Sequence, residues 1–190
     1  MKLLFITGII LSSTFLIASG NEPTAKTINI ATSTVAWKAA KVTGTHEGFI
    51  KFKAGSLKFE GDLLIGGELV VDMTTIDCTD MKGGGKTKLE GHLKSDDFFG
   101  VANHPTSTIK FTKVNSRGIA GEYKITANIT IKNITKEIKF NATLKAGAGT
   151  ATIKLDRSDF DIRYGSGSFF DNLGDKTIFD EFDLSVSVSL

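Results

Sequence analysis

The sequence predicts an all-β protein, folded as a closed antiparallel β-barrel of about eight strands with one short helical insert. Three observations support this class. Apolar and polar residues alternate over long stretches of the second half of the chain, turns containing glycine or asparagine separate these stretches, and only residues 89–99 depart from alternation toward helical spacing. Closing the sheet on itself covers strands that are apolar on one side. An interior of about eight strands is either packed with side chains or holds one small ligand.

The overall composition excludes several classes of protein. Among 190 residues, 23 lysines and arginines face 21 aspartates and glutamates, so the net charge of +2 leaves no basic excess for binding nucleic acid. A single cysteine cannot form a disulfide within the chain or supply a thiolate metal cluster. The hydrophobic fraction of 41% is sufficient for a core. Without a linker or a repeat, one domain over residues 21–190 is expected.

Residues 1–20 have the three parts of a secretory signal peptide. The first two residues give a positive start, an apolar stretch follows over residues 3–17, and Ala18-Ser19-Gly20 offers the small residues that signal peptidase accepts. The alternative is an uncleaved N-terminal anchor, but the apolar run is shorter than the roughly 20 residues of a membrane-spanning helix. Cleavage after Gly20 would make residues 21–190 a periplasmic or secreted protein.

Strand candidates follow one another along the rest of the chain. The shorter ones cover residues 34–40, 48–53, 63–72, 106–114 and 150–155. The clearest alternation places Tyr123, Ile125, Ala127, Ile129 and Ile131 on one face. It resumes over residues 138–144 after a turn at residue 133, so these two strands are predicted to form a β-hairpin. The last strand covers residues 182–190 and alternates in the same way.

Residues 89–99 are predicted to form a short helix or two helical turns, because Leu89, Leu93 and Phe98 lie near helical spacing. The three glycines at 83–85, followed by Lys86-Thr87, resemble the end of a phosphate-binding loop. That motif requires a further glycine where this chain has Asp80, so a flexible connector is the better interpretation.

The polar residues form no catalytic or metal motif. His46, His92 and His104 have no histidine partner at ligand spacing, and surface or capping roles are expected for them. The acidic residues between positions 156 and 180 do not follow the spacing of a calcium loop. Arginines and lysines lie between them, which favours structural ion pairs. We therefore expect no catalytic residue, no cofactor and no metal.

The apolar faces are the remaining candidate for a functional site. The chain has 14 phenylalanines but only two tyrosines and one tryptophan. A packed core explains most of them, and a hollow lumen would need the same residues, so the sequence leaves both states open. A hollow lumen lined in this way would suit an aliphatic or prenyl ligand.

Several segments resemble the YceI-like family of polyisoprenoid-binding proteins. Residues 89–99 (LEGHLKSDDFF) and 104–109 (HPTSTI) resemble its hallmark helix-and-strand segment. Further similar segments are residues 66–76, 127–140, 156–162 and 173–184, so the resemblance extends in the expected order over about residues 28–190. The departures include Ala127 and Asn133 in place of the usual glycines of the hairpin, which alter turn geometry more than fold.

The resemblance implies a lipocalin-like barrel that binds a long isoprenoid chain in a tunnel, as a periplasmic or secreted carrier without enzymatic activity. The expected partner is a polyisoprenoid or an isoprenoid quinone, while transient membrane contact and a homodimer are left open. The residues expected to line the tunnel are Trp37, Phe49, Phe52, Phe98, Phe99, Phe111, Ile129, Phe140 and Phe182.

Two other classes of protein are alternatives. An outer-membrane β-barrel also needs a signal peptide and alternating strands, but its apolar faces point outward and it carries girdles of tyrosine and tryptophan, which are scarce here. A lipid-acting hydrolase would need a constellation of polar residues inside the barrel, and none of the spacings above provides one.

Overall fold

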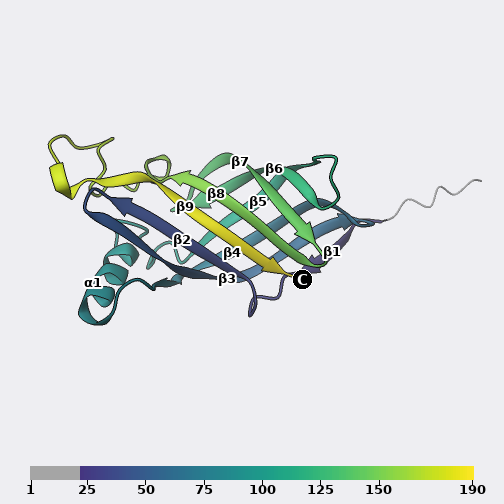
Figure 1. The fold of residues 1–190 in the computed structure, drawn as a ribbon, viewed down its shortest axis with the longest axis horizontal. Coiled ribbons are helices and arrows are strands. Elements are labelled where there is room, and N and C mark those ends of the chain that lie inside the picture. The colour runs from purple at the N-terminus through teal and green to yellow at the C-terminus, as the bar shows by residue number, and fades with distance from the viewer. Residues whose placement is uncertain (1–21) are drawn as a thin grey trace, which may run out of the picture.

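Nine strands follow one another along residues 22–190, the part of the chain that the computed structural model describes (Figure 1). The predicted signal peptide, residues 1–20, lies outside the described residues. The strands are β1 (Thr24–Thr27), β2 (Thr34–Lys41), β3 (Gly44–Glu60), β4 (Leu63–Cys78), β5 (Thr106–Ser116), β6 (Glu122–Ile131), β7 (Ile134–Lys145), β8 (Ala148–Asp156) and β9 (Ile178–Ser189). One α-helix, α1 (Gly83–Lys94), and two 3₁₀ turns, η1 (Arg157–Phe160) and η2 (Gly174–Lys176), complete the fold.

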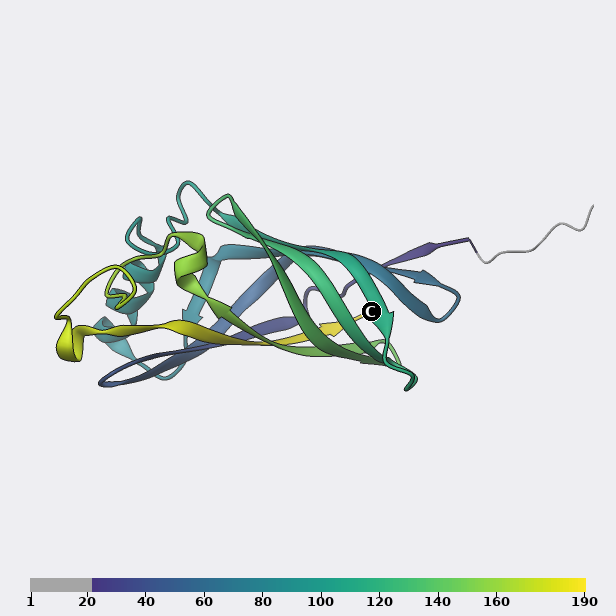
Figure 2. The same ribbon diagram turned by 90° about the horizontal axis from the view of Figure 1, so that it is seen from above.

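The sheet closes into an antiparallel barrel because β3 pairs with β4 as well as with β2. β3 is 17 residues long, and its first half pairs with β2 while its second half pairs with the short β1. β1 and β2 therefore share one position in the ring, which has eight positions in all. This confirms the predicted fold class. Both views show a barrel that is longer than it is wide, with α1 and the connection from η1 to β9 at the same end (Figures 1 and 2).

The predicted alternation sets which side chains face the interior. In β6, the five residues Tyr123, Ile125, Ala127, Ile129 and Ile131 are all buried, and the polar residues between them are not. β6 and β7 pair as the predicted hairpin. The turn between them consists of two residues, Lys132 and Asn133, which both have positive φ values, 49° and 62°. This is the pattern of the turns that fit the twist of a two-residue hairpin.

The helix differs from the prediction at both ends. It begins at Gly83, so the glycines expected to form a flexible connector make its first turn instead, and it ends at Lys94, after which residues 95–99 form turns. Glycine is a poor helix former, so contacts with β4 stabilise this helix. The Lys86 amine lies 2.7 Å from the Asp77 carboxylate, and the Glu90 carboxylate accepts a hydrogen bond of 2.8 Å from the Cys78 amide.

The connection from η1 to β9 is organised around one buried arginine. Arg157 is only 5% exposed, and it donates hydrogen bonds of 2.8–3.2 Å to the carbonyl oxygens of Ile162, Tyr164, Ile178 and Phe179. Its guanidinium also lies 3.0 Å from the Asp180 carboxylate. Four of the five N–H groups of the guanidinium thus donate to carbonyl oxygens, and the Asp180 carboxylate balances its charge. The sequence-based expectation of structural ion pairs is confirmed here and at Arg163–Asp161.

Replacing Arg157 by lysine should destabilise the fold strongly. An amine has three donors and no planar fork, so it leaves buried carbonyl groups and Asp180 without full partners, at a cost of roughly 3–5 kcal/mol. Urea unfolding followed by circular dichroism measures this change. The matched control is Arg163→Lys, because that side chain is largely exposed. Equal stability of the two variants would contradict the role given to Arg157.

The turn between β7 and β8 should accept a stabilising substitution. Ala146 has φ of 50° and precedes Gly147, which has φ of 78°. A left-handed conformation costs a non-glycine residue about 1–2 kcal/mol, and asparagine tolerates it best. We expect Ala146→Asn to raise the free energy of unfolding by about 0.5–1 kcal/mol, since Asn-Gly is the preferred pair for such a turn. Ala148→Asn, in the extended backbone of β8, should not stabilise the protein in the same urea titration.

Candidate functional site

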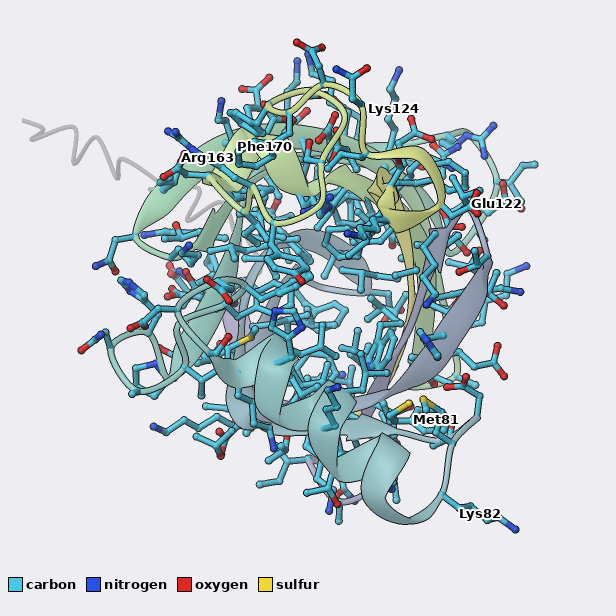
Figure 3. All side chains as sticks on the ribbon, turned by 90° about the vertical axis from the view of Figure 1, so that its left-hand side faces the viewer. Met81, Lys82, Glu122, Lys124, Arg163 and Phe170 are labelled. Carbon is cyan, nitrogen blue, oxygen red and sulfur yellow. The ribbon has the colours of Figure 1, made fainter. Side chains whose placement is uncertain are left out.

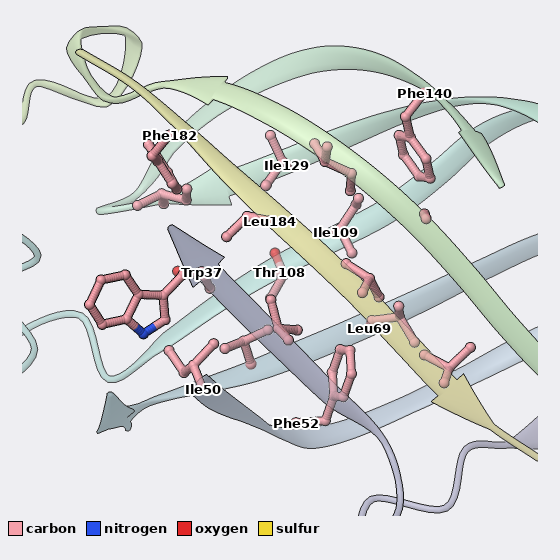
Figure 4. Close-up of a pocket in the computed structure, with 18 of the residues that line it drawn as sticks. Trp37, Ile50, Phe52, Leu69, Thr108, Ile109, Ile129, Phe140, Phe182 and Leu184 are labelled. Carbon is pink, nitrogen blue, oxygen red and sulfur yellow. The ribbon is translucent and has the colours of Figure 1, made fainter. Parts of the chain in front are cut away.

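The interior of the barrel is hollow. Side chains from β2 to β9 and from the end of α1 surround an apolar cavity of about 210 Å³ (Figure 4). The polar lining residues are Ser107, Thr108, Thr143, Thr150 and Arg157, and the rest of the wall is aliphatic, aromatic or glycine. Because four N–H groups of Arg157 already donate to carbonyl oxygens and Asp180 balances its charge, the guanidinium is held by the wall rather than offered to a ligand. The cavity is therefore suited to an apolar chain.

The end of the barrel that carries α1 and residues 161–177, here called the mouth of the cavity, faces the viewer in Figure 3. At this end the wall includes Phe179, whose side chain is half exposed. At the opposite end it includes Leu57 and Leu64, which are both buried. The opposite end also includes Leu144, which is half-buried, and Thr150, which is exposed, so wall residues reach the surface at both ends.

Most of the residues predicted to line a tunnel are on the cavity wall. These are Trp37, Phe52, Phe98, Phe99, Phe111, Ile129, Phe140 and Phe182. Phe49 is not: its side chain is 47% exposed and points out of the barrel, so its expected place on the wall is wrong. Successive strand residues face opposite sides, and Gly48, Ile50 and Phe52 take the inner face. Whether any wall residue contacts a ligand stays a prediction.

Small residues keep the lumen open, and the sequence reasoning missed them. Ala142 of β7 and Ala151 of β8 lie directly opposite each other on the wall. These two positions lack the bulk that would fill the lumen. Gly149, also on the wall, is small for another reason: a Cβ atom there would lie 2.7 Å from Val188 Cγ2, so the glycine makes room for that side chain. The sequence signal was small residues on the apolar face of strands otherwise rich in large side chains.

Trp37 carries a buried hydrogen-bond donor at the cavity. Its indole Nε1 is buried and has no partner among residues 22–190. The ring lies against Gly48, its neighbour across the β2–β3 pair, where a Cβ atom would be 2.8 Å from Trp37 Cζ2. The glycine therefore makes room for the indole. An unpaired buried donor of this kind costs about 1–3 kcal/mol, so it is notable on the wall of an otherwise apolar cavity.

An aromatic cluster joins α1 to the mouth of the cavity. The ring of His92 lies 4.9 Å from that of Phe98 and 4.4 Å from that of Tyr164, both in edge-on geometry. The Arg157 guanidinium lies 5.9 Å from the centre of the Phe98 ring. His92 thus has a packing role between α1 and the 161–177 connection, in place of the surface or capping role that was expected.

The other two histidines lie apart from the cavity wall. His104 has a buried Nδ1 without a partner in the described part of the chain. His46 Nδ1 lies 2.8 Å from Asp80 Oδ2, and Cys78 Sγ donates to Asp80 Oδ1 at 3.0 Å. The hydrogen bond from Cys78 is the main reason that the pKa of Asp80 is well below its usual range. Burial, together with this carboxylate, raises the pKa of the Cys78 thiol to about 11. At neutral pH the carboxylate is ionised and the thiol is protonated.

No helix within residues 22–190 is both long enough and apolar enough to cross a membrane.

Solved structures resemble this barrel at low sequence identity. BcnA of Burkholderia cenocepacia superposes with a TM-score of 0.69 at 19% identity, over 86% of this chain and 99% of that chain. A polyisoprenoid binding domain from Saccharophagus degradans gives 0.57 at 14%, over 85% and 95% of the two chains. The Campylobacter jejuni YCEI protein gives 0.54 at 16%, over 100% and 98%. At these identities the likeness concerns the fold.

Sequence comparison identifies the family. The UPF0312 protein of Pseudomonas aeruginosa is 35% identical over 88 residues, which cover 40% of this chain and 44% of that protein. The match therefore spans less than half of that relative. The model of the YceI-like domain matches residues 26–190, nearly the whole of the part that the structure describes. With this match, the resemblance seen in the sequence is confirmed, and the chain belongs to the YceI-like domain family.

Proposed function

We propose that this barrel binds one long apolar lipid, a polyisoprenoid or an isoprenoid quinone, and acts as its carrier in the periplasm or outside the cell. The observation that carries the proposal is the hollow lumen with an almost wholly apolar wall. The polyisoprenoid binding domain from Saccharophagus degradans, which shares the fold, supports the choice of lipid. The predicted signal peptide over residues 1–20 supports the location.

Binding would depend on the burial of the chain rather than on polar contacts. Each CH₂ group that moves from water into the cavity contributes roughly 0.8 kcal/mol. A branched prenyl tail has many such groups, so a wall of isoleucine, leucine, valine and phenylalanine holds it without specific hydrogen bonds. A site of this kind discriminates weakly between tails that differ by one or two carbons.

The head group would lie at the mouth, beside Trp37. The indole N–H there has no acceptor among residues 22–190. The carbonyl of a quinone or the phosphate of a polyprenyl phosphate could accept its hydrogen bond. Four of the five N–H groups of Arg157 already donate to carbonyl oxygens and its charge is paired with Asp180, so Trp37 is the better candidate for recognising the polar end.

The structure favours this proposal over the two alternatives. A transmembrane barrel presents an apolar band to lipid, whereas the residues on the outer side of β6 include Lys124, Thr126 and Asn128. A hydrolase would need a base beside its nucleophile. The hydroxyl groups on the cavity wall come from one serine and three threonines, and the wall residues within 22–190 include no histidine, aspartate or glutamate beside them.

Filling the lumen should abolish lipid binding. Ala151→Phe places a ring where two alanines now face each other, so we expect at least tenfold weaker binding of undecaprenyl phosphate and ubiquinone. Native mass spectrometry of protein incubated with each lipid measures the bound fraction. Thr152→Phe is the matched control, because the adjacent side chain is exposed on the outer face. Unchanged binding in Ala151→Phe, with the fold intact by circular dichroism, would refute the proposed site.

Removing only the Trp37 N–H should reveal its role. Trp37→Phe retains an aromatic ring but lacks the donor, and a net hydrogen bond of about 0.5–1.5 kcal/mol corresponds to roughly 2- to 13-fold weaker binding. We expect this loss for ubiquinone and undecaprenyl phosphate but not for squalene, which has no acceptor. Fluorescence competition with an apolar dye compares the three lipids. An equal loss for squalene would show that Trp37 acts only through packing.

A further inference from the structure

Three side chains with metal-binding atoms meet beside the mouth of the cavity. They are His46 on β3, Cys78 at the end of β4 and Asp80 in the turn before α1, and their ligand atoms all lie within 4.8 Å of one another. None of them belongs to the cavity wall described above. The sequence spacing concealed this group, because His46 lies 32 residues before Cys78 and no motif links them.

The sheet itself brings these residues together. Cys78 pairs with Gly48 across β3 and β4, and His46 lies two residues before Gly48, on the same side of its strand. The turn is tied to β3 by two hydrogen bonds: the Thr79 amide donates to the Glu47 carbonyl at 2.9 Å, and the Glu47 amide donates to Asp80 Oδ1 at 3.1 Å. The group is therefore held by paired backbone on both sides.

The three donors are of the types that zinc prefers. Imidazole nitrogen, cysteine sulfur and carboxylate oxygen all ligate Zn²⁺, commonly with three protein ligands and one water in a tetrahedral arrangement. Cys78 is fully buried, while the side chains of His46 and Asp80 are each about one quarter exposed, at 29% and 27%, so an ion has a path from solvent.

The distances are close to what an ion requires. Zinc holds its ligands at about 2.0–2.3 Å, so donor atoms around one ion lie roughly 3.3–3.8 Å apart. Asp80 now forms one hydrogen bond with His46 at 2.8 Å and accepts another from the Cys78 thiol at 3.0 Å. Once the thiol has lost its proton, shifts of about 1 Å in the side chains would let the three donor atoms surround one ion.

We propose that His46, Cys78 and Asp80 form a zinc site with one coordination position left for water. The ion would join β3 to the junction of β4 and α1, next to the mouth of the cavity. This site is separate from the lipid cavity, so its test does not depend on lipid binding.

Titration of the metal-free protein with Co²⁺ and then Zn²⁺ tests the proposal. We expect one Co²⁺ per chain, with visible d–d bands of a four-coordinate ion and a near-ultraviolet band from thiolate-to-cobalt charge transfer. Zn²⁺ should displace Co²⁺ and remove both bands. Cys78→Ser should lose the charge-transfer band, and His46→Gln and Asp80→Asn should each bind Zn²⁺ at least tenfold more weakly by calorimetry.

His92→Gln is the matched control, because this histidine packs against aromatic rings away from the three donors. It should bind both ions as the unaltered protein does. If Cys78→Ser fails to fold, His46→Gln decides the matter, since its side chain is partly exposed. Absence of stoichiometric binding, or unchanged Zn²⁺ affinity in His46→Gln, would overturn the proposal.

Discussion

The pairing of β3 with β4 is the contact on which the rest of the structure depends. Strands β2 to β9 each have one apolar face, and these faces are shielded from water only when the two ends of the sheet meet. The length of β3 makes this possible, because it holds β1 and β2 on one side and β4 on the other. Irregularities in the β3–β4 register, between Phe49 and Lys51 and again near Phe52, let the long strands curve around the lumen.

A hollow lumen also lowers the stability of the folded barrel. Side chains that border empty space lose the dispersion contacts that a packed core would give them. Ala142 and Ala151 nevertheless occupy positions where larger residues would fill the gap. A ligand that binds only the folded barrel recovers such contacts and shifts the folding equilibrium toward the native state by mass action. Stability and occupancy are therefore coupled in this fold.

The sequence predicted the parts of the fold that follow from a period of two. The alternation in β6 and β7 predicted their inner face and the hairpin that they form. The same rule could have excluded Phe49, because Phe49 and Phe52 differ by three positions and cannot share a face of a regular strand, and Lys51 and Lys53 mark the outer side. What the pattern could not show was contact between distant segments. The start of α1 at Gly83 depends on Asp77 and Cys78 of β4, and the meeting of His46 with Asp80 depends on the register of β3 and β4.

The mouth of the cavity, where the head group is proposed to lie, would give a bound lipid a direction. With the tail pointing toward the buried Leu57 and Leu64, the head would stay outside or at the rim. The depth of the tube then acts as a ruler: a tail shorter than this depth is hidden completely, whereas a longer one leaves its first isoprene units in the opening. The barrel would thus present the reactive end of every cargo outward, in the orientation that an enzyme or acceptor at a membrane surface would meet first.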